Sequence, residues 1–152
     1  MTPKEECEVL LDALLPAAED LLKKHTEFYP IGAVLTLDSR VSFTGVLSDN
    51  AFPESQEVID ELIACHRQKA EHNEIKASAI AWNAVITTSD NKKSDAVIIR
   101  LEHCGDYSVT VGIPYKIGLF RKIHFGALFA EPGKHDIFQS NGQSKPPVEP
   151  VV

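Results

Sequence analysis

The sequence predicts an α+β domain in which an antiparallel sheet of about five strands packs with two main helices. Two segments place apolar residues at the 3.6-residue spacing of a helix, and several shorter segments alternate apolar and polar residues as strands do. The predicted order is helix, strand, strand, helix and then three strands. A doubly wound parallel sheet would alternate helices and strands one for one, so this order favours antiparallel pairing.

The first helix is expected over residues 3–25. Thr2, Pro3 and Glu5 form the pattern of a capping box with proline at the first helical position. Apolar residues then recur on one face: Cys7, Leu10, Leu11, Leu14, Ala18, Leu21 and Leu22. Pro16 removes one backbone hydrogen bond within this pattern. Two outcomes stay open, a kink in one helix or two short helices that meet there.

A β-hairpin is expected over residues 31–47, with its turn at residues 38–39. Apolar residues alternate with smaller or more polar ones in both arms: Ile31, Ala33, Leu35 and Leu37, then Val41, Phe43 and Leu47. Gly32 inside the first strand indicates a bulge or a close backbone approach. Phe28 and Tyr29 are both expected to fill the junction between the first helix and this hairpin.

The second helix is expected from Pro53 to about residue 73. Its apolar face is formed by Val58, Ile59, Leu62, Ile63 and Ala70. Three further strands are expected over residues 77–88, 95–104 and 107–113. A single dry surface beneath the helices is expected to contain Val97, Ile99, Leu101, His103, Tyr107, Val109, Val111 and Ile113. The opposite surface carries Arg100 and Glu102, and we expect a polar network on an open face there.

Residues 114–138 have no single period, but they are too apolar to form a free loop. We expect a short turn or helix at residues 118–122, followed by an extended segment that packs. Residues 139–152 have the composition of a disordered tail. The domain is therefore assigned to residues 1–138, and the tail to residues 139–152.

The order of elements across residues 3–115 resembles that of profilin-like and roadblock-type domains. The resemblance implies a family of folds whose members are small-molecule sensors, dimerisation modules and cytoskeletal adaptors. The run FYPIGAVL, residues 28–35, is also similar to a motif in small bacterial proteins of unknown function. Because one fold hosts many functions, the resemblance does not select one of them.

The composition, with 43% hydrophobic and 24% charged residues, is that of an ordinary soluble domain. The net charge is −7, and residues 1–30 carry three basic and seven acidic side chains. Nucleic acid is therefore not an expected partner, because phosphate neutralisation needs a basic surface. No apolar run approaches the ~20 residues of a membrane span, and no signal-peptide pattern is present. We expect a cytoplasmic protein with reduced thiols and no membrane partner.

Metal and catalytic motifs are not expected. Cys65–His66 and His103–Cys104 are adjacent pairs, and neighbouring residues on a strand point to opposite faces, which disfavours a shared metal ion. The sequence has no Gly-x-Ser-x-Gly elbow and no phosphate-binding glycine loop. We therefore expect no metal, no cofactor and no catalytic residue, and we expect His103 to be a hydrogen-bonded, partly buried imidazole.

Positive charge concentrates in YKIGLFRKIHF, residues 115–125. The candidate binding residues are the aromatic and basic side chains of this segment and a polar pair from a neighbouring strand: Tyr115, Lys116, Phe120, Arg121, Lys122, His124, Arg100 and Glu102. Two interpretations stay open. Either the aromatic rings close the core while the cations reach solvent, or the segment is a contact site.

These observations predict a non-catalytic interaction or regulatory module that associates with a protein partner or with itself as a homodimer. One alternative is a sensor that binds a small anionic metabolite between the polar sheet face and residues 115–125. Another is a small enzyme that uses Glu102, His103 or Cys104.

Overall fold

The structure is a computed structural model that describes residues 1–45 and 54–138. The helices are α1 (Pro3–His25), α2 (Ser55–Glu71) and a 3₁₀ turn, η1 (Leu119–Arg121). The strands are β1 (Ile31–Thr36), β2 (Val41–Thr44), β3 (Ile75–Thr87), β4 (Lys93–His103), β5 (Tyr107–Ile117), β6 (Ile123–Phe125) and β7 (Phe129–Pro132). The expected tail at residues 139–152 lies outside the described residues, as do Leu47 and Pro53.

The strands form one antiparallel sheet in the order β2-β1-β3-β4-β5-β6, and β7 also pairs with β5. The described part of the chain therefore has seven strands, where the sequence predicted about five. The difference arises after β5, where the expected extended segment forms β6 and β7 in succession along one edge. β6 pairs with residues 115–117 of β5, and β7 pairs with residues 109–112.

α1 begins and ends where the sequence predicts. The Thr2 backbone N–H donates to Glu5 Oε1 at 2.8 Å, and the Glu5 N–H donates to Thr2 Oγ1 at 3.1 Å, which completes the capping box. Thr26 ends the helix in the left-handed conformation with φ 65°. The helix continues through Pro16, so one helix, and not two, occupies residues 3–25.

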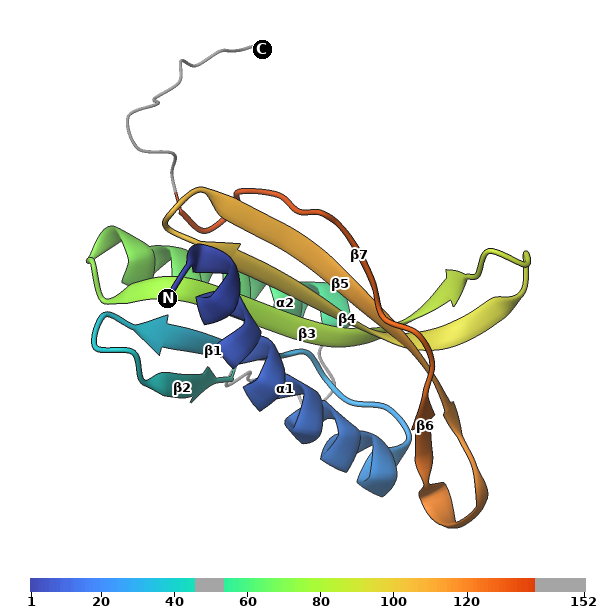
Figure 1. Ribbon diagram of the computed structural model, residues 1–152. Helices are drawn as coiled ribbons and strands as arrows, with labels where there is room; N and C mark the ends of the chain where they lie inside the picture. The colour runs from blue at the N-terminus through green and yellow to red at the C-terminus, as the bar shows by residue number, and fades with distance from the viewer. Residues whose placement is uncertain (46–53, 139–152) are drawn as a thin grey trace.

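α1 covers one face of the sheet (Figure 1). Cys7, Leu10, Leu14, Ala18 and Leu22 are fully buried against small side chains of β3: Ala77, Ala79 and Ala81. The predicted dry surface lies on this face. Its buried members are Val97, Ile99, Leu101, His103, Val111 and Ile113, and Tyr107 and Val109 pack partly buried beside them. Period-two burial in β4 and β5 is therefore confirmed.

α2 lies on the opposite face of the sheet, so the expectation that both helices cover one face was wrong (Figure 1). Val58 and Leu62 of α2 pack on Ile80, whose neighbours in β3 point to α1. The physical reason is that β3 is buried on both faces, because Ser78 and Ile80 are as inaccessible as the alanines between them. The helix ends at Glu71, close to the predicted end.

The β1–β2 hairpin forms, but two of its apolar residues are not buried. Leu37 and Phe43 are each 57% exposed, because Leu37 lies in the turn of the hairpin and Phe43 lies on β2, a short strand at the edge of the sheet. Tyr29 is 49% exposed, so only Phe28 fills the junction after α1. Gly32 does mark a close approach: a Cβ there would lie 2.4 Å from the Thr44 hydroxyl oxygen.

Candidate functional site

The basic segment forms a hairpin, which we call the finger and define as residues 115–125. Figure 1 shows it extending past the C-terminal end of α1. Its inner face is apolar, because Tyr115 pairs with Phe125 and Ile117 pairs with Ile123, and these residues join the core beneath α1. Tyr115 is buried, and burial raises the pKa of its hydroxyl to about 12. Tyr115 therefore lies in the core and does not reach the surface.

The outer face of the finger is cationic. Lys116 and His124 are register partners on β5 and β6, so their side chains stand side by side, and both are exposed. Lys122 is exposed two residues nearer the tip than His124. Gly118 leaves room for the imidazole of His124, since a Cβ at this position would lie 2.9 Å from Nε2. Lys116, Lys122 and His124 thus share one side of the hairpin, away from the core.

The tip of the finger presents apolar side chains in an unfavourable backbone conformation. Phe120 (φ 57°, ψ 29°) and Arg121 (φ 58°) both have positive φ, as in a type I′ turn, where glycine and asparagine are preferred. The Lys122 N–H closes the turn on the Leu119 carbonyl at 3.2 Å. Leu119 is 84% exposed and Phe120 fully exposed. The tip therefore displays two large apolar side chains to solvent.

Arg121 fixes the tip against α1. Its Nη1 donates to the carbonyl of Lys24 at 2.6 Å and to that of Lys23 at 3.3 Å. These carbonyls belong to the last turn of α1, where the helix leaves acceptors without intrahelical partners and favours positive charge. Arg121 thus acts as a structural anchor, and it leaves Leu119 and Phe120 as the outermost groups of the finger.

Arg100 and Glu102 are not part of the finger. They lie on the α2 side of the sheet, and this face is not open as the sequence suggested, because the chain after β7 crosses it. We call residues 134–138 the strap. Glu102 is buried and accepts hydrogen bonds from strap backbone N–H groups, while the Arg100 guanidinium pairs with the Asp136 carboxylate. The two halves of the predicted site are therefore separate features of the molecule.

A cavity of about 10 Å³ lies between the strap and the sheet. Its lining includes Ser78, Arg100, Glu102 and Ser108. Burial raises the pKa of the Glu102 carboxyl, while the strap N–H groups act in the opposite direction. The volume is close to that of one water molecule and far below the ~300 Å³ of a small-molecule pocket.

The three groups of the enzyme alternative do not converge. His103 points to the α1 side of β4, Glu102 points to the strap, and Cys104 is exposed beyond the strand end. His103 is a buried, hydrogen-bonded imidazole as predicted. Its Nδ1 accepts from the Gly105 N–H at 2.8 Å, so the proton of the neutral ring lies on Nε2, which is 2.9 Å from Glu6 Oε1.

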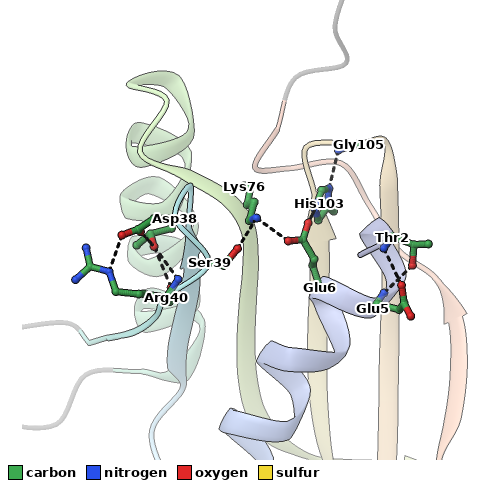
Figure 2. A network of polar contacts seen from close by, with 10 residues as sticks. Thr2, Glu5, Glu6, Asp38, Ser39, Arg40, Lys76, His103 and Gly105 are labelled. Atoms are coloured by element: carbon green, nitrogen blue, oxygen red, sulfur yellow. Dashed lines mark hydrogen bonds and ion pairs between the residues drawn. The ribbon is translucent and has the colours of Figure 1, made fainter.

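Glu6 joins α1 to two strands (Figure 2). Its second carboxylate oxygen, Oε2, lies 2.6 Å from Lys76 Nζ, and Lys76 also donates to Ser39 Oγ at 2.7 Å. Hydrogen bonds from Lys76 and His103 lower the pKa of Glu6. These contacts satisfy a carboxylate that is otherwise nearly buried, so the network has a structural role.

A second buried histidine was missed from the sequence. His66 on α2 is fully buried, with Nε2 2.7 Å from Thr44 Oγ1 and Nδ1 2.7 Å from Ser78 Oγ. Burial lowers its pKa to about 4, so the ring is neutral at pH 7. The sequence did contain a signal, because His66 follows Leu62 by four residues on the apolar face of the helix.

The described ranges, 1–45 and 54–138, contain no group of three or more His, Cys, Asp and Glu side chains placed to hold a metal ion. Within the same ranges, neither helix has the length and apolar character needed to cross a bilayer. In comparisons with known proteins, no family model, no curated protein and no solved structure matches this chain.

Proposed function

We propose that the protein is a non-catalytic interaction module that contacts a protein partner through the finger, and that the first candidate partner is a second copy of the chain. One observation carries the proposal: Leu119 and Phe120 project into solvent from a tip that is anchored to α1 by Arg121. Aromatic residues, phenylalanine included, and arginine are enriched at the cores of protein interfaces.

The energetic cost of the tip supports this interpretation. A non-glycine residue in the left-handed region costs about 1–2 kcal/mol, and both Phe120 and Arg121 adopt it. Full burial of a leucine or phenylalanine side chain would contribute about 1.5–3 kcal/mol, which Leu119 and Phe120 do not gain in the isolated chain. A partner that covers the tip would supply this burial free energy, which would offset the cost of the backbone conformation.

Charge complementarity favours an acidic partner surface. Two lysines and His124 flank the exposed tip. On α1, carboxylates pair with lysines four residues away: Glu8 with Lys4, Glu19 with Lys23 and Asp20 with Lys24. On α2, Glu57, Asp60 and Glu61 are exposed, and none forms an ion pair with a described residue. The first half of α2 on a second copy is therefore a suitable surface for the finger.

Such a contact joins different surfaces of the two copies. A closed two-fold dimer would then contain the finger–α2 contact twice, whereas other arrangements would give rings or open chains. A protein partner also fits better than a small anion, because the cavity beside Arg100 and Glu102 measures only about 10 Å³.

Sedimentation velocity over a concentration series tests the proposal. The wild-type chain is expected to self-associate, and Phe120→Ser is expected to weaken association about ten-fold or more. Leu37→Ser is the matched control, because Leu37 is another exposed apolar residue but lies in the β1–β2 turn. Lys116→Glu should also weaken association, and Asp60→Lys in the same chain should restore part of it.

Two results would count against the proposal. A wild-type chain that stays monomeric at several hundred micromolar would remove the second copy as the partner. Equal effects of Phe120→Ser and Leu37→Ser would show that general surface hydrophobicity, and not the finger, governs association.

A further inference from the structure

The strap is bound to the sheet through its backbone. Glu102 Oε1 accepts from the N–H groups of Asp136 and Ile137 at 3.0 Å each, and Oε2 accepts from the Phe138 N–H at 2.7 Å. Ser108 Oγ donates to the Lys134 carbonyl at 2.6 Å. A single buried carboxylate thus satisfies three successive backbone donors of a segment that forms neither helix nor strand.

Strap side chains add recognition to these backbone contacts. The Asp136 carboxylate pairs with Arg100, and its carbonyl accepts from Arg67 Nε at 2.8 Å. Ile137 and Phe138 are 5% and 8% exposed. They pack in an apolar cluster with buried residues of β1 and β3 and partly buried residues of α2: Val34, Ile75, Ile63 and Ala70. Four elements, β1, β3, β4 and α2, therefore contact three consecutive residues of the strap, Asp136 to Phe138.

Domains that bind extended peptides combine the same kinds of contact, although there the backbone of a sheet edge, and here the Glu102 carboxylate, binds the segment's backbone. Backbone hydrogen bonds supply affinity, and a charged partner and apolar pockets supply specificity. The groups that make the groove (Arg67, Arg100 and Glu102) all belong to α2 and β4, and neither element contains a residue of the strap. Gly133 connects the strap to β7, and its N–H bonds to the Ser108 carbonyl at 3.2 Å.

We propose that the groove between α2 and β4 is a peptide-binding site for an extended segment with an aspartate followed by two large apolar residues, and that the strap is its occupant in cis. The ligand is a peptide of the Asp-Ile-Phe type. Glu102 binds its backbone, Arg100 binds its aspartate, and the apolar cluster around Val34 and Ile75 takes its last two side chains. A partner protein with such a segment displaces the strap.

The cis occupant sets the affinity that a competitor must overcome. A segment tethered through a few residues acts at an effective concentration of about millimolar, so a free peptide with the same contacts binds the wild-type chain only weakly. Weakening the strap without altering the groove should expose the site. Asp136 and Phe138 are suitable positions, because both belong to the occupant and neither lies in α2 or β4.

The test uses the full chain and a fluorescein-labelled, C-terminally amidated peptide of residues 133–138. Fluorescence anisotropy should show that the D136A/F138A variant binds this peptide about ten-fold or more tightly than the wild-type chain does. A peptide with Asp136→Asn should bind less tightly, and Arg100→Met in the double variant should abolish the gain. The single variant Asp136→Ala, which keeps both apolar anchors, provides the same comparison if the double variant does not fold.

Equal binding of the peptide by the wild-type chain and by a variant that circular dichroism shows to be folded would overturn the proposal. So would a gain that survives Arg100→Met and the Asn peptide, because such binding would not use the groove. Neither outcome depends on the finger, so the result is independent of the self-association experiment.

Discussion

Acid should destabilise the fold through His66, which is buried between α2 and the sheet. Both ring nitrogens contact hydroxyl oxygens, of Thr44 and Ser78, at 2.7 Å, and no described carboxylate pairs with the ring. A neutral imidazole fits this site because one nitrogen donates while the other accepts. A protonated ring would place an uncompensated charge in the core, and the nearby Lys69 opposes it further.

The magnitude follows from the pKa of His66, which burial lowers from 6.5 to about 4. Between these values the unfolded chain binds the proton and the folded chain does not. The folded chain therefore has its full stability, with His66 neutral, above pH 6.5, and the free energy of unfolding decreases as the pH falls from 6.5 toward 4. The free energy of unfolding should decrease by about 2 kcal/mol from pH 7 to pH 5, and by about 3 kcal/mol in full, at ~1.4 kcal/mol per pKa unit.

Urea unfolding at pH 7, 6 and 5 measures this decrease, and His66→Gln is the control because glutamine does not titrate. The variant should be less stable at pH 7, but its stability should change much less between pH 7 and pH 5. This range lies above the lowered pKa of Glu6, so that carboxylate does not contribute. If the variant retains the slope of the wild-type chain, another group carries the pH dependence and the assignment to His66 is wrong.

Three further predictions concern the core and the thiols. Lys76→Met removes the hydrogen bond that contributes most to the lowered Glu6 pKa. The loss of stability in acid below pH 4.5 should therefore be smaller in this variant than in the wild-type chain, which urea unfolding at pH 5 and pH 3.5 would measure. Leu14→Ala should lower the free energy of unfolding by about 2–5 kcal/mol with an unchanged urea m-value, because Leu14 is fully buried between α1 and the sheet. With Ellman's reagent at pH 8, the exposed Cys104 should react rapidly and Cys7 should not, because burial raises the Cys7 pKa to about 12. Cys104→Ser should therefore remove the rapid phase of the reaction, and Cys7→Ser should leave this phase unchanged.

Local patterns in the sequence were sufficient to predict the positions of the two main helices and of the central strands. The capping box at Thr2 and the spacing from Cys7 to Leu22 predicted the start of α1, its buried face and its approximate end, because these signals lie within the helix itself. The alternation in β4 and β5 predicted which side chains lie beneath α1, since one face of each strand is apolar and the other polar. α2 is different: β3 is buried on both sides, so its pattern does not indicate which face receives the second helix.

Contacts between distant segments could not be predicted in the same way. The strap binds Glu102 through backbone N–H groups, which every residue except proline possesses, and the partners are 34 to 36 residues apart. Arg121 likewise binds backbone carbonyls of Lys23 and Lys24 that are about a hundred positions earlier. Such contacts leave no periodicity or motif in the sequence, and Arg121 therefore appeared only as one cation among several.

The segment without a period, residues 114–138, contains both the finger and the strap, which is the proposed cis occupant of the groove. The missing period and these two proposed roles have one physical cause. A strand or helix that only closes a core repeats its apolar positions, because the surface beneath it is regular. Here the chain departs from the strand pattern twice, at the finger tip and at the strap. Arg121 binds backbone carbonyls at the tip, and Glu102 binds strap N–H groups beside the Arg100–Asp136 pair and the apolar cluster of Ile137 and Phe138. Polar contacts with backbone groups do not depend on the side chains of the segment that they hold, and the peptide-binding proposal requires that another chain can replace those at the strap. Core variants such as Leu14→Ala should consequently alter stability without a selective effect on association. Phe120 variants should alter association while the unfolding transition changes little, and Asp136→Ala should alter peptide binding with a smaller loss of stability than Leu14→Ala.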